Sequence, residues 1–286
     1  DYDPAGRLTE LVEPSGSTSF AWSPDGRPES TVRPNQVTTS FAYDPAGRLV
    51  GVDHTGPDGA IDTFAYTLDE TGNRTQVSSS SVTDTHPPAA LLRLLAATYP
   101  GATAETFAYD SAGNRTTHTH SGGTTTYSYD PAGRLAVATS PGDTTSFEHD
   151  DAGNLIATSD GESFEWDSQG QLVGATTSEA TQTYRYDPDG IRIGVDDADQ
   201  LWDRISTSLP TLIDDGTATY THSSRGLHTQ TDADGTRWVH ADALGSIRAL
   251  SGADGATIGT ATYQAFGEPL STTGATSSFG FTGEHH

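Results

Sequence analysis

The stretch Phe41-Ala42-Tyr43-Asp44-Pro45-Ala46-Gly47-Arg48-Leu49 predicts the end of a β-strand followed by a tight hairpin turn. Phe41 and Tyr43 are two residues apart, so on a strand their side chains point to the same face. Asp44-Pro45-Ala46-Gly47 suits a type I turn, and a type I turn that ends in a left-handed glycine gives a three-residue hairpin loop with a bulge. Such a loop places Asp44 opposite Arg48. Their contact is worth roughly 0.2–1 kcal/mol, so it mainly fixes the register of the hairpin.

The same pattern recurs nine times, and its regular spacing is the strongest signal in the sequence. Gly113, Gly133 and Gly153 lie 20 residues apart, and so do Gly6 and Gly26. Some copies carry Asn where others carry Arg. The turn residues singled out are Tyr2, Asp3, Gly6, Arg7, Tyr43, Asp44, Gly47, Arg48, Tyr109, Asp110, Gly113, Asn114, Tyr129, Asp130, Gly133, Arg134, Asp150, Gly153, Asn154, Trp166, Asp167, Gly170, Tyr186, Asp187 and Gly190.

A second turn falls about half a period after each of these, as at Pro14-Ser15-Gly16 and Pro141-Gly142-Asp143. Each unit of about 20 residues therefore holds two strands and two turns, which predicts an all-β fold built as a long antiparallel meander. One unit cannot bury a large core by itself, so its aromatic side chains are expected to stack on those of neighbouring units.

One segment departs from this pattern. His86-Pro87-Pro88 precedes a leucine-rich run in which Leu91, Leu94 and Leu95 would share a helix face, so we expect a short helical insertion over about 86–98. Two interpretations stay open: a decoration that packs its leucines on the sheet, or a plug or subunit contact.

The composition excludes several classes of protein. A formal charge of −25 repels phosphate backbones and anionic headgroups, so nucleic acid and membrane surfaces are unsuited partners. No apolar run approaches the ~20 residues of a membrane span, and the absence of Cys excludes disulfides. Regularly spaced aromatics argue against disorder. The chain begins inside a repeat, so we expect it to be a fragment of a longer protein.

These repeats resemble the RHS/YD-repeat family, which includes bacterial RHS proteins, the shell components of insecticidal toxin complexes and the teneurins. The C-terminal third carries a further likeness. Trp238 to Leu250 is similar to the His-x-Asp-x-Leu-Gly-Ser-x-Arg stretch of the RHS-associated core, on His240, Asp242, Gly245 and Arg248. Phe279-Gly280-Phe281-Thr282-Gly283-Glu284 is similar to the segment that follows, whereas Gln264 stands where the family usually has Asp.

The resemblance implies a spiral, curved β-shell that encloses a C-terminal passenger, commonly a toxin. It divides the chain into a repeat sheet over 1–195, and degenerate repeats with the start of the core over 196–286. The passenger would lie outside this fragment. The expected partners are the missing repeats and that passenger, in a secreted or cell-surface bacterial protein. An alternative is a module that binds carbohydrate or another cell surface.

The sequence gives little support for an enzyme or a metal protein. The acidic turns Asp187–Gly190, Asp196–Asp199 and Asp232–Gly235 lack the spacing of an EF-hand, and Asp-Gly is a common hairpin signal. His118 and His120 could face one metal ion, but no third ligand is evident. No Gly-x-Ser-x-Gly or phosphate-binding loop occurs. We therefore expect no catalytic, cofactor-binding or metal-binding residues and no cofactor.

Overall fold

The computed structural model describes residues 1–79, 83–85, 94–99, 104–205 and 210–285 of the chain. The chain divides into two compact units. Unit 1 comprises residues 1–101 together with 220–286, and unit 2 comprises residues 102–219. Each unit is described separately.

Nearly all regular structure is β-strand. In unit 1 the strands are β1 (Glu10–Glu13), β2 (Gly16–Trp22), β3 (Pro28–Val32), β4 (Thr38–Tyr43), β5 (Leu49–Gly56), β6 (Gly59–Leu68), β7 (Arg74–Ser79), β8 (Thr83–Thr85), β9 (Ala96–Ala97), β23 (Thr219–Ser223), β24 (Gly226–Asp232), β25 (Gly235–Ala241), β26 (Ile247–Ser251), β27 (Thr257–Tyr263) and β28 (Pro269–Gly274), followed by the short 3-10 helix η1 (Phe281–Gly283).

In unit 2 the strands are β10 (Glu105–Tyr109), β11 (Arg115–His120), β12 (Gly123–Tyr129), β13 (Leu135–Ser140), β14 (Asp143–His149), β15 (Leu155–Thr158), β16 (Ser163–Trp166), β17 (Leu172–Thr176), β18 (Thr181–Tyr186), β19 (Arg192–Val195), β20 (Ala198–Asp199), β21 (Leu201–Asp203) and β22 (Thr211–Asp214).

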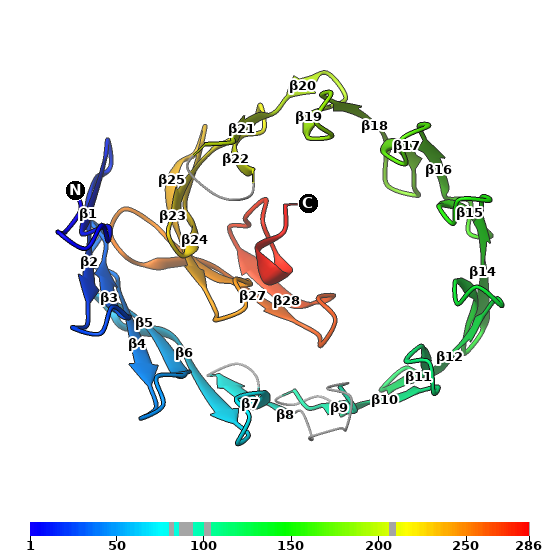
Figure 1. Cartoon of the computed structure of the whole chain (residues 1–286), viewed down its shortest axis with the longest axis horizontal. Helices are drawn as coiled ribbons and strands as arrows, with labels where there is room; N and C mark the ends of the chain where they lie inside the picture. The colour runs from blue at the N-terminus through cyan, green and yellow to red at the C-terminus, as the bar shows by residue number, and fades with distance from the viewer. Residues whose placement is uncertain (80–82, 86–93, 100–103, 206–209, 286) are drawn as a thin grey trace. The chain divides into compact units, whose positions relative to one another are not determined.

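Unit 1 contains two antiparallel sheets, each with its strands in sequence order. We call β1 to β8 the N-terminal sheet and β23 to β28 the C-terminal sheet. Both are meanders because short turns join each strand to the next one (Figure 1).

The two sheets of unit 1 share buried contacts. Phe64 and Val52, each 1 % exposed, form a cluster with Tyr66 on the N-terminal sheet, and Ala243 of the C-terminal sheet packs against it. The Ala243 amide donates a hydrogen bond of 2.9 Å to the Tyr66 hydroxyl oxygen. Further residues of the C-terminal sheet are also buried, namely Trp238, Val239, Ile247, Ala249 and Leu250. Unit 1 is therefore a two-layer structure with a core between its layers.

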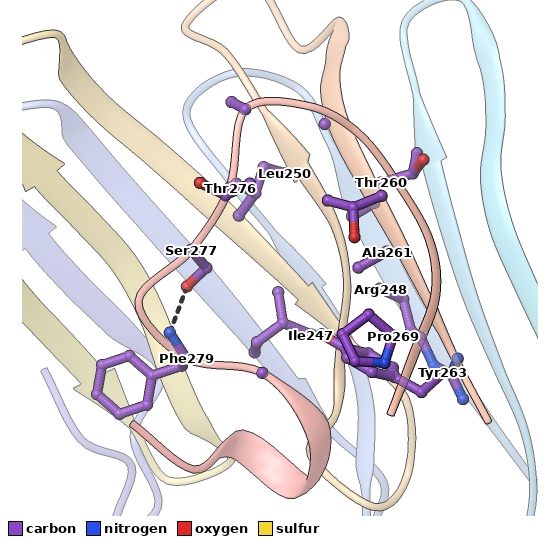
Figure 2. A pocket seen from close by; sticks show the side chains of 15 residues that line it. Ile247, Arg248, Leu250, Thr260, Ala261, Tyr263, Pro269, Thr276, Ser277 and Phe279 are labelled. Atoms are coloured by element: carbon purple, nitrogen blue, oxygen red, sulfur yellow. Dashed lines mark hydrogen bonds between the residues drawn. The ribbon is translucent and has the colours of Figure 1, made fainter. Parts of the chain in front are cut away.

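The chain after β28 folds back over the C-terminal sheet. The Ile247 amide donates to the Gly280 carbonyl at 3.0 Å, and the Thr282 amide donates to the Ser246 hydroxyl at 3.0 Å. This return closes a small, mainly apolar cavity of about 130 Å³, lined by Ile247, Leu250 and Phe279 among others (Figure 2). The Ser277 hydroxyl, which accepts from the Phe279 amide at 3.1 Å, holds the returning segment in shape.

Unit 2 is built differently. Strands β10 to β20 follow one another in a single sheet, and β21 pairs with β22. Along β12, β14, β16 and β18 the aromatic residues alternate with exposed ones, and the aromatic side chains are only half-buried. In the described part of unit 2 fully buried hydrophobic residues are few; they are Phe107, Leu212 and Ala218.

The predicted all-β antiparallel meander is confirmed, whereas the predicted helix is wrong in its described part. Residues 86–93 of that prediction lie outside the described residues. Its described end contains strand β9 at Ala96–Ala97 instead of a helix. Ala97 and Tyr99 are buried on either side of an exposed Thr98, so burial at a period of two outweighs the helix propensity of the leucines and alanines. The division at 195/196 stays a prediction.

Candidate functional site

The repeat turn, named here for the Tyr-Asp-x-x-Gly motif, is a bulged hairpin loop held by its aspartate. Asp44 Oδ1 accepts from the Arg48 amide at 2.8 Å, and Oδ2 accepts from Arg48 Nε at 2.7 Å. Gly47 has φ 81° and donates to the Asp44 carbonyl at 2.9 Å. The register shifts between Ala42 and Tyr43, which is the bulge. The Arg48 amide, with smaller contributions from its side chain, lowers the pKa of Asp44.

Other repeat turns share this arrangement. The aspartate accepts from the backbone amide and from the side chain four residues on, which is Arg in some turns and Asn in others. The Asn73 side chain, helped by Thr71, lowers the pKa of Asp69 to about 2. These pairs are Asp3 with Arg7, Asp130 with Arg134, Asp69 with Asn73, Asp110 with Asn114 and Asp150 with Asn154.

Two later turns keep only the backbone part of this contact. Asp167 accepts from the Gln171 amide at 2.9 Å, and Asp187 accepts from the Ile191 amide at 2.9 Å. Asp187 forms its ion pair with Arg204 instead, which directly follows β21.

The arginine of the repeat turn also joins one turn to the next. Arg7 Nη1 donates to the Ser23 carbonyl at 3.1 Å, and Arg48 Nη1 donates to the Asp69 carbonyl at 3.0 Å. Arg134 repeats the contact with the Asp150 carbonyl at 3.1 Å. The shorter Asn side chain is engaged within its own turn, as at Asn114. Arginine therefore sets the spacing of adjacent repeats, a role that the sequence alone did not show.

The aromatic residue just before the repeat turn makes a second connection between repeats. In four places its polar atom donates to the carbonyl two residues beyond the glycine of the preceding turn. These bonds run from Trp22 Nε1 to Leu8, from Trp166 Nε1 to Leu155, from Trp202 Nε1 to Arg192 and from the Tyr129 hydroxyl to Arg115, at 2.6–2.8 Å. The ring of each aromatic side chain thus contributes packing, and its polar atom fixes the register between neighbouring repeats.

The motif at 240–248 forms a buried version of the repeat turn. Asp242 Oδ1 accepts from the Ser246 amide at 3.1 Å, and Gly245 has φ 88°. The arginine partner lies two residues further on: Arg248 Nε donates to Asp242 Oδ2 at 2.9 Å, and the two side chains are 11 % and 4 % exposed. The Arg248 guanidinium lies over the rings of Phe64 and Tyr263. This turn therefore connects the two sheets of unit 1.

His240, from the same motif, lies in a buried polar cluster that the sequence did not reveal. We use the name polar cluster for Arg33, Thr39, His54, His228 and His240. The rings of His54 and His240 are 5.2 Å apart between centroids. These residues come from the turn after β3, from β4 and β5, and from β24 and β25. The two groups lie about 200 residues apart in sequence, so no local pattern could have brought them together.

Each histidine of the polar cluster is neutral. Burial, with a further contribution from the Arg33 charge, lowers the pKa of His54 and His228 to about 3 and that of His240 well below its usual value. His54 Nε2 lies 3.1 Å from the Ala241 carbonyl oxygen, which can only accept, so this nitrogen carries the proton. His54 Nδ1 then accepts from the Thr39 hydroxyl at 2.9 Å.

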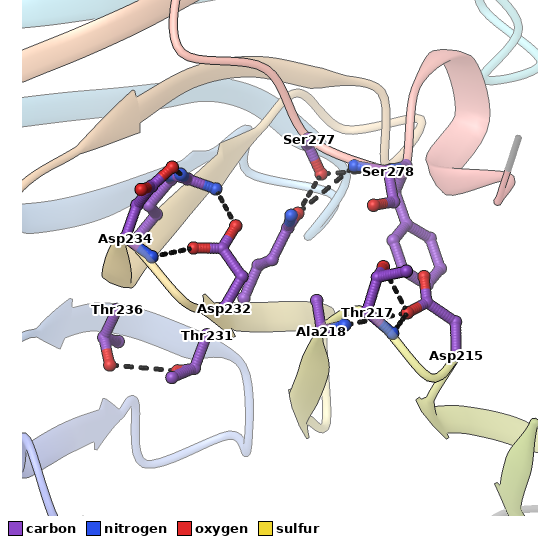
Figure 3. Close-up of polar contacts among 12 residues, drawn as sticks. Asp215, Thr217, Ala218, Thr231, Asp232, Asp234, Thr236, Ser277 and Ser278 are labelled. Atoms are coloured by element: carbon purple, nitrogen blue, oxygen red, sulfur yellow. Dashed lines mark hydrogen bonds and ion pairs between the residues drawn. The ribbon is translucent and has the colours of Figure 1, made fainter. Parts of the chain in front are cut away.

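Several acidic turns considered for calcium hold arginine instead. Asp232 and Asp234, which Figure 3 labels, both pair with Arg237. Asp187 and Asp189 both pair with Arg204. At the remaining turn Asp196 Oδ1 accepts from the Thr183 amide at 2.7 Å. An ion pair or a hydrogen bond thus accounts for these carboxylates.

The described part of the chain contains neither a metal-binding cluster nor a membrane-spanning helix. No three His, Cys, Asp or Glu residues there are grouped so as to hold a metal ion. His118 and His120 do lie together, 5.0 Å apart between ring centroids, and His118 Nε2 is 3.6 Å from a Glu105 carboxylate oxygen. No described helix is long and apolar enough to cross a membrane.

Solved structures with the same fold come from toxin complexes. The crystal structures of TcdB2-TccC3-Cdc42 and of TcdB2-TccC3 match the whole chain at 16 % and 17 % identity, with TM-scores of 0.62 and 0.60. The Photorhabdus luminescens Tc holotoxin pore with a TccC3 mutation matches at 16 % identity and a TM-score of 0.58. The chain spans 18 % of the length of each of these solved chains. At such identities the likeness shows the fold.

The family is shown by a match along the sequence. No curated protein gave a match. The Teneurin YD-shell family model, however, matches residues 1–139 and 89–284, which together take in nearly the whole sequence. The matched region contains the repeat turns, the connections between them and the buried turn at Asp242. The chain therefore belongs to the Teneurin YD-shell family.

Proposed function

We propose that this chain is part of the wall of a bacterial YD-repeat shell that houses and delivers a C-terminal toxin passenger. The observation that carries the proposal is the connection of several repeats to their neighbours by arginine and aromatic side chains, which lets a sheet grow by repetition. The likeness to toxin-complex structures supports the same role. Secretion from the cell follows from such a role.

The buried turn at Asp242 supports a structural role for the C-terminal third. Its amides, its ion pair and its neighbour Ala243 are all engaged with the N-terminal sheet or with the turn itself. No group in it is left to act on a substrate, so we propose that it holds the wall together and performs no reaction.

The test is a proteolysis experiment on the longer natural protein. The coding sequence beyond His286 should encode a passenger, and that passenger should resist protease inside the intact protein. The same passenger, expressed alone, should be digested rapidly. Equal digestion rates in the two settings would refute the housing role, as would a coding sequence without a passenger.

A second candidate function rests on the half-buried aromatics of unit 2. Tyr127, Phe147, Phe164 and Tyr184 alternate with exposed residues on their strands. A row of accessible aromatic rings can stack on sugars, so a carbohydrate- or cell-surface-binding module remains the alternative proposal. A glycan array probed with the 286-residue chain separates the two, because a wall segment should give no signal.

A further inference from the structure

A polar cavity of about 460 Å³ lies in unit 1, between residues of its N-terminal and C-terminal sheets. Its lining includes Arg33, Thr39, His54, Ser223, Arg225 and His228. Wall packing alone does not explain this composition, because a space between two sheets is usually filled by apolar side chains.

Arg33 is the main feature of this cavity. The residue is 8 % exposed, and its Nη1 and Nη2 donate to Thr39 Oγ1 at 2.7 Å and to the Val239 carbonyl at 3.1 Å. Both acceptors are neutral, and the buried Nε has no acceptor. Burial lowers the pKa of Arg33 only to about 10, so the guanidinium stays charged at neutral pH. Arg33 is thus a buried cation with no ion pair among the described residues.

Glu13 and Asp242, two largely buried carboxylates of unit 1, have other neighbours. Glu13 Oε1 accepts from the Thr229 hydroxyl at 3.1 Å, whereas its buried Oε2 lies 3.7 Å from His228 Nε2 without a hydrogen bond. Asp242 lines the cavity but forms its ion pair with Arg248. The histidines are neutral and cannot compensate a positive charge. A buried charge normally requires a paired opposite charge, so an anion is missing from this arrangement.

We propose that this cavity binds an oxyanion, a phosphate or carboxylate group, through Arg33 and Arg225. A guanidinium offers planar, paired donors that suit such a group, and water excluded from the cavity would strengthen the contact. The exposed Arg225, which lies over the Phe41 ring, adds a second cation at the cavity. Ser223, whose hydroxyl lies 3.5 Å from the Gly226 carbonyl oxygen, also lines the cavity. This site does not depend on the presence of a passenger.

The charge of the whole chain makes the test selective. With a net charge of −25, the protein as a whole repels anions, so general attraction to phosphate is not expected. The 286-residue chain is titrated with inorganic phosphate, and in a separate arm with acetate, at constant ionic strength set by sodium chloride. Calorimetry and the ³¹P line width of phosphate report binding directly. Thermal unfolding reports the stabilisation that follows from binding to the folded state.

Three variants locate the site. Arg33→Met keeps much of the apolar stem and removes the charge, and we expect it to abolish both the heat of binding and the anion-dependent rise in Tm. Arg225→Gln should weaken binding roughly tenfold, the loss of one charged contact. Arg134→Met, the matched control in unit 2, removes the same charge from a residue that does not line the cavity, and this variant should bind phosphate as the unchanged chain does.

Each result of these titrations either supports or overturns the oxyanion site. Binding of phosphate alone identifies a phosphate site, and binding of acetate as well identifies a general carboxylate and phosphate site; both support the proposal. Absence of heat and of ³¹P broadening with the unchanged chain would overturn it. Retained binding in Arg33→Met would overturn it as well. If Arg33→Met does not fold, Arg225→Gln decides, and unaltered affinity there contradicts the assigned site.

Discussion

Unit 1 and unit 2 use the same repeat turn but reach stability by different routes. In unit 1 a C-terminal sheet covers an N-terminal sheet, and Val52 and Phe64 are almost fully buried between them. In unit 2 the corresponding aromatics, such as Tyr127 and Tyr184, stay half-buried on a single sheet. The repeat therefore does not create a core by itself. It makes a sheet, and a core forms only where a second layer covers that sheet.

The largest expected difference between the two units is the stability that each loses at acidic pH. His54, His228 and His240 are held neutral in the folded state, whereas in the unfolded chain they bind a proton below about pH 6.5. Their contribution to stability is therefore present above pH 6.5 and is lost as the pH falls towards about 3. At about pH 4.5 the loss is about 2–3 kcal/mol per histidine.

Unit 2 should lose less stability over the same range. Burial lowers the pKa of His118 there, so this one histidine also loses stability below about pH 6.5. Aspartates of unit 2 such as Asp110 and Asp130 have lowered pKa values, so their contribution is lost only below about pH 3.8. Hydrogen exchange measured peptide by peptide at pH 7 and about pH 4.5 gives the comparison. Equal loss of protection in the two units would show that the buried histidines of unit 1 do not control its stability.

The ion pair of Asp242 with Arg248 in unit 1 is more deeply buried than the pair of Asp130 with Arg134 in unit 2. Asp242→Asn should cost about 3–5 kcal/mol, because it leaves the buried Arg248 charge unpaired. Asp130→Asn in unit 2 breaks the same kind of pair at a more exposed turn and should cost clearly less, because solvent screens the charges there. Urea unfolding of both variants measures the difference. Similar losses would mean that burial of the Asp242 turn does not matter.

Two glycines with nearly equal backbone angles provide a finer test. Gly133 has φ 80° and open space where a methyl group would lie, whereas a Cβ on Gly255, φ 81°, would lie 2.3 Å from the Asn35 carbonyl oxygen. Gly133→Ala adds only the backbone strain of about 1–2 kcal/mol. Gly255→Ala adds a collision that pushes the two sheets of unit 1 apart, for a total of about 2–5 kcal/mol. Thermal unfolding of the pair should show this order, and the reverse order would contradict the packing of the sheets.

The smallest expected loss of stability comes from removing the hydrogen bond by which an arginine joins one repeat turn to the next. Arg134→Asn keeps the contact with Asp130, as Asn114 does with Asp110, but loses the bond to the Asp150 carbonyl. We expect a loss of about 0.5–1 kcal/mol in unit 2. Loss of this bond should appear as faster hydrogen exchange confined to the turns around Asp130 and Asp150. Unchanged exchange would show that the bond does not couple the two repeats.

Local chemistry explains which features the sequence could predict. The turn around Asp44 was predictable because Asp, Pro and Gly each favour one position of one short loop. The strand before this turn was predictable because Phe41 and Tyr43, two residues apart, share one face of a strand. Strand β9 was missed because the burial of Ala97 and Tyr99 depends on neighbours far away in sequence.

The polar cluster lay beyond prediction for a related reason. Arg33 lies in a turn and His228 on strand β24, and neither stands out in the sequence; only the packing of two sheets makes them buried. The connection from Arg134 to the Asp150 carbonyl likewise depends on the register between repeats, which the motif does not encode within itself. The motif predicts each hairpin, whereas the polar cluster arises only when the sheets of unit 1 pack together.

The central claim is that the C-terminal sheet forms a second, locking layer on the N-terminal sheet, whereas unit 2 is a single layer. Hydrogen exchange of the 286-residue chain at neutral pH tests it most directly. We expect the amides of β5, β6, β25 and β26 to exchange together and most slowly, through global opening, and those of β12 to β18 to exchange faster. Rapid exchange in β25 and β26 while β5 and β6 stay protected, or equal protection in unit 2, would contradict it.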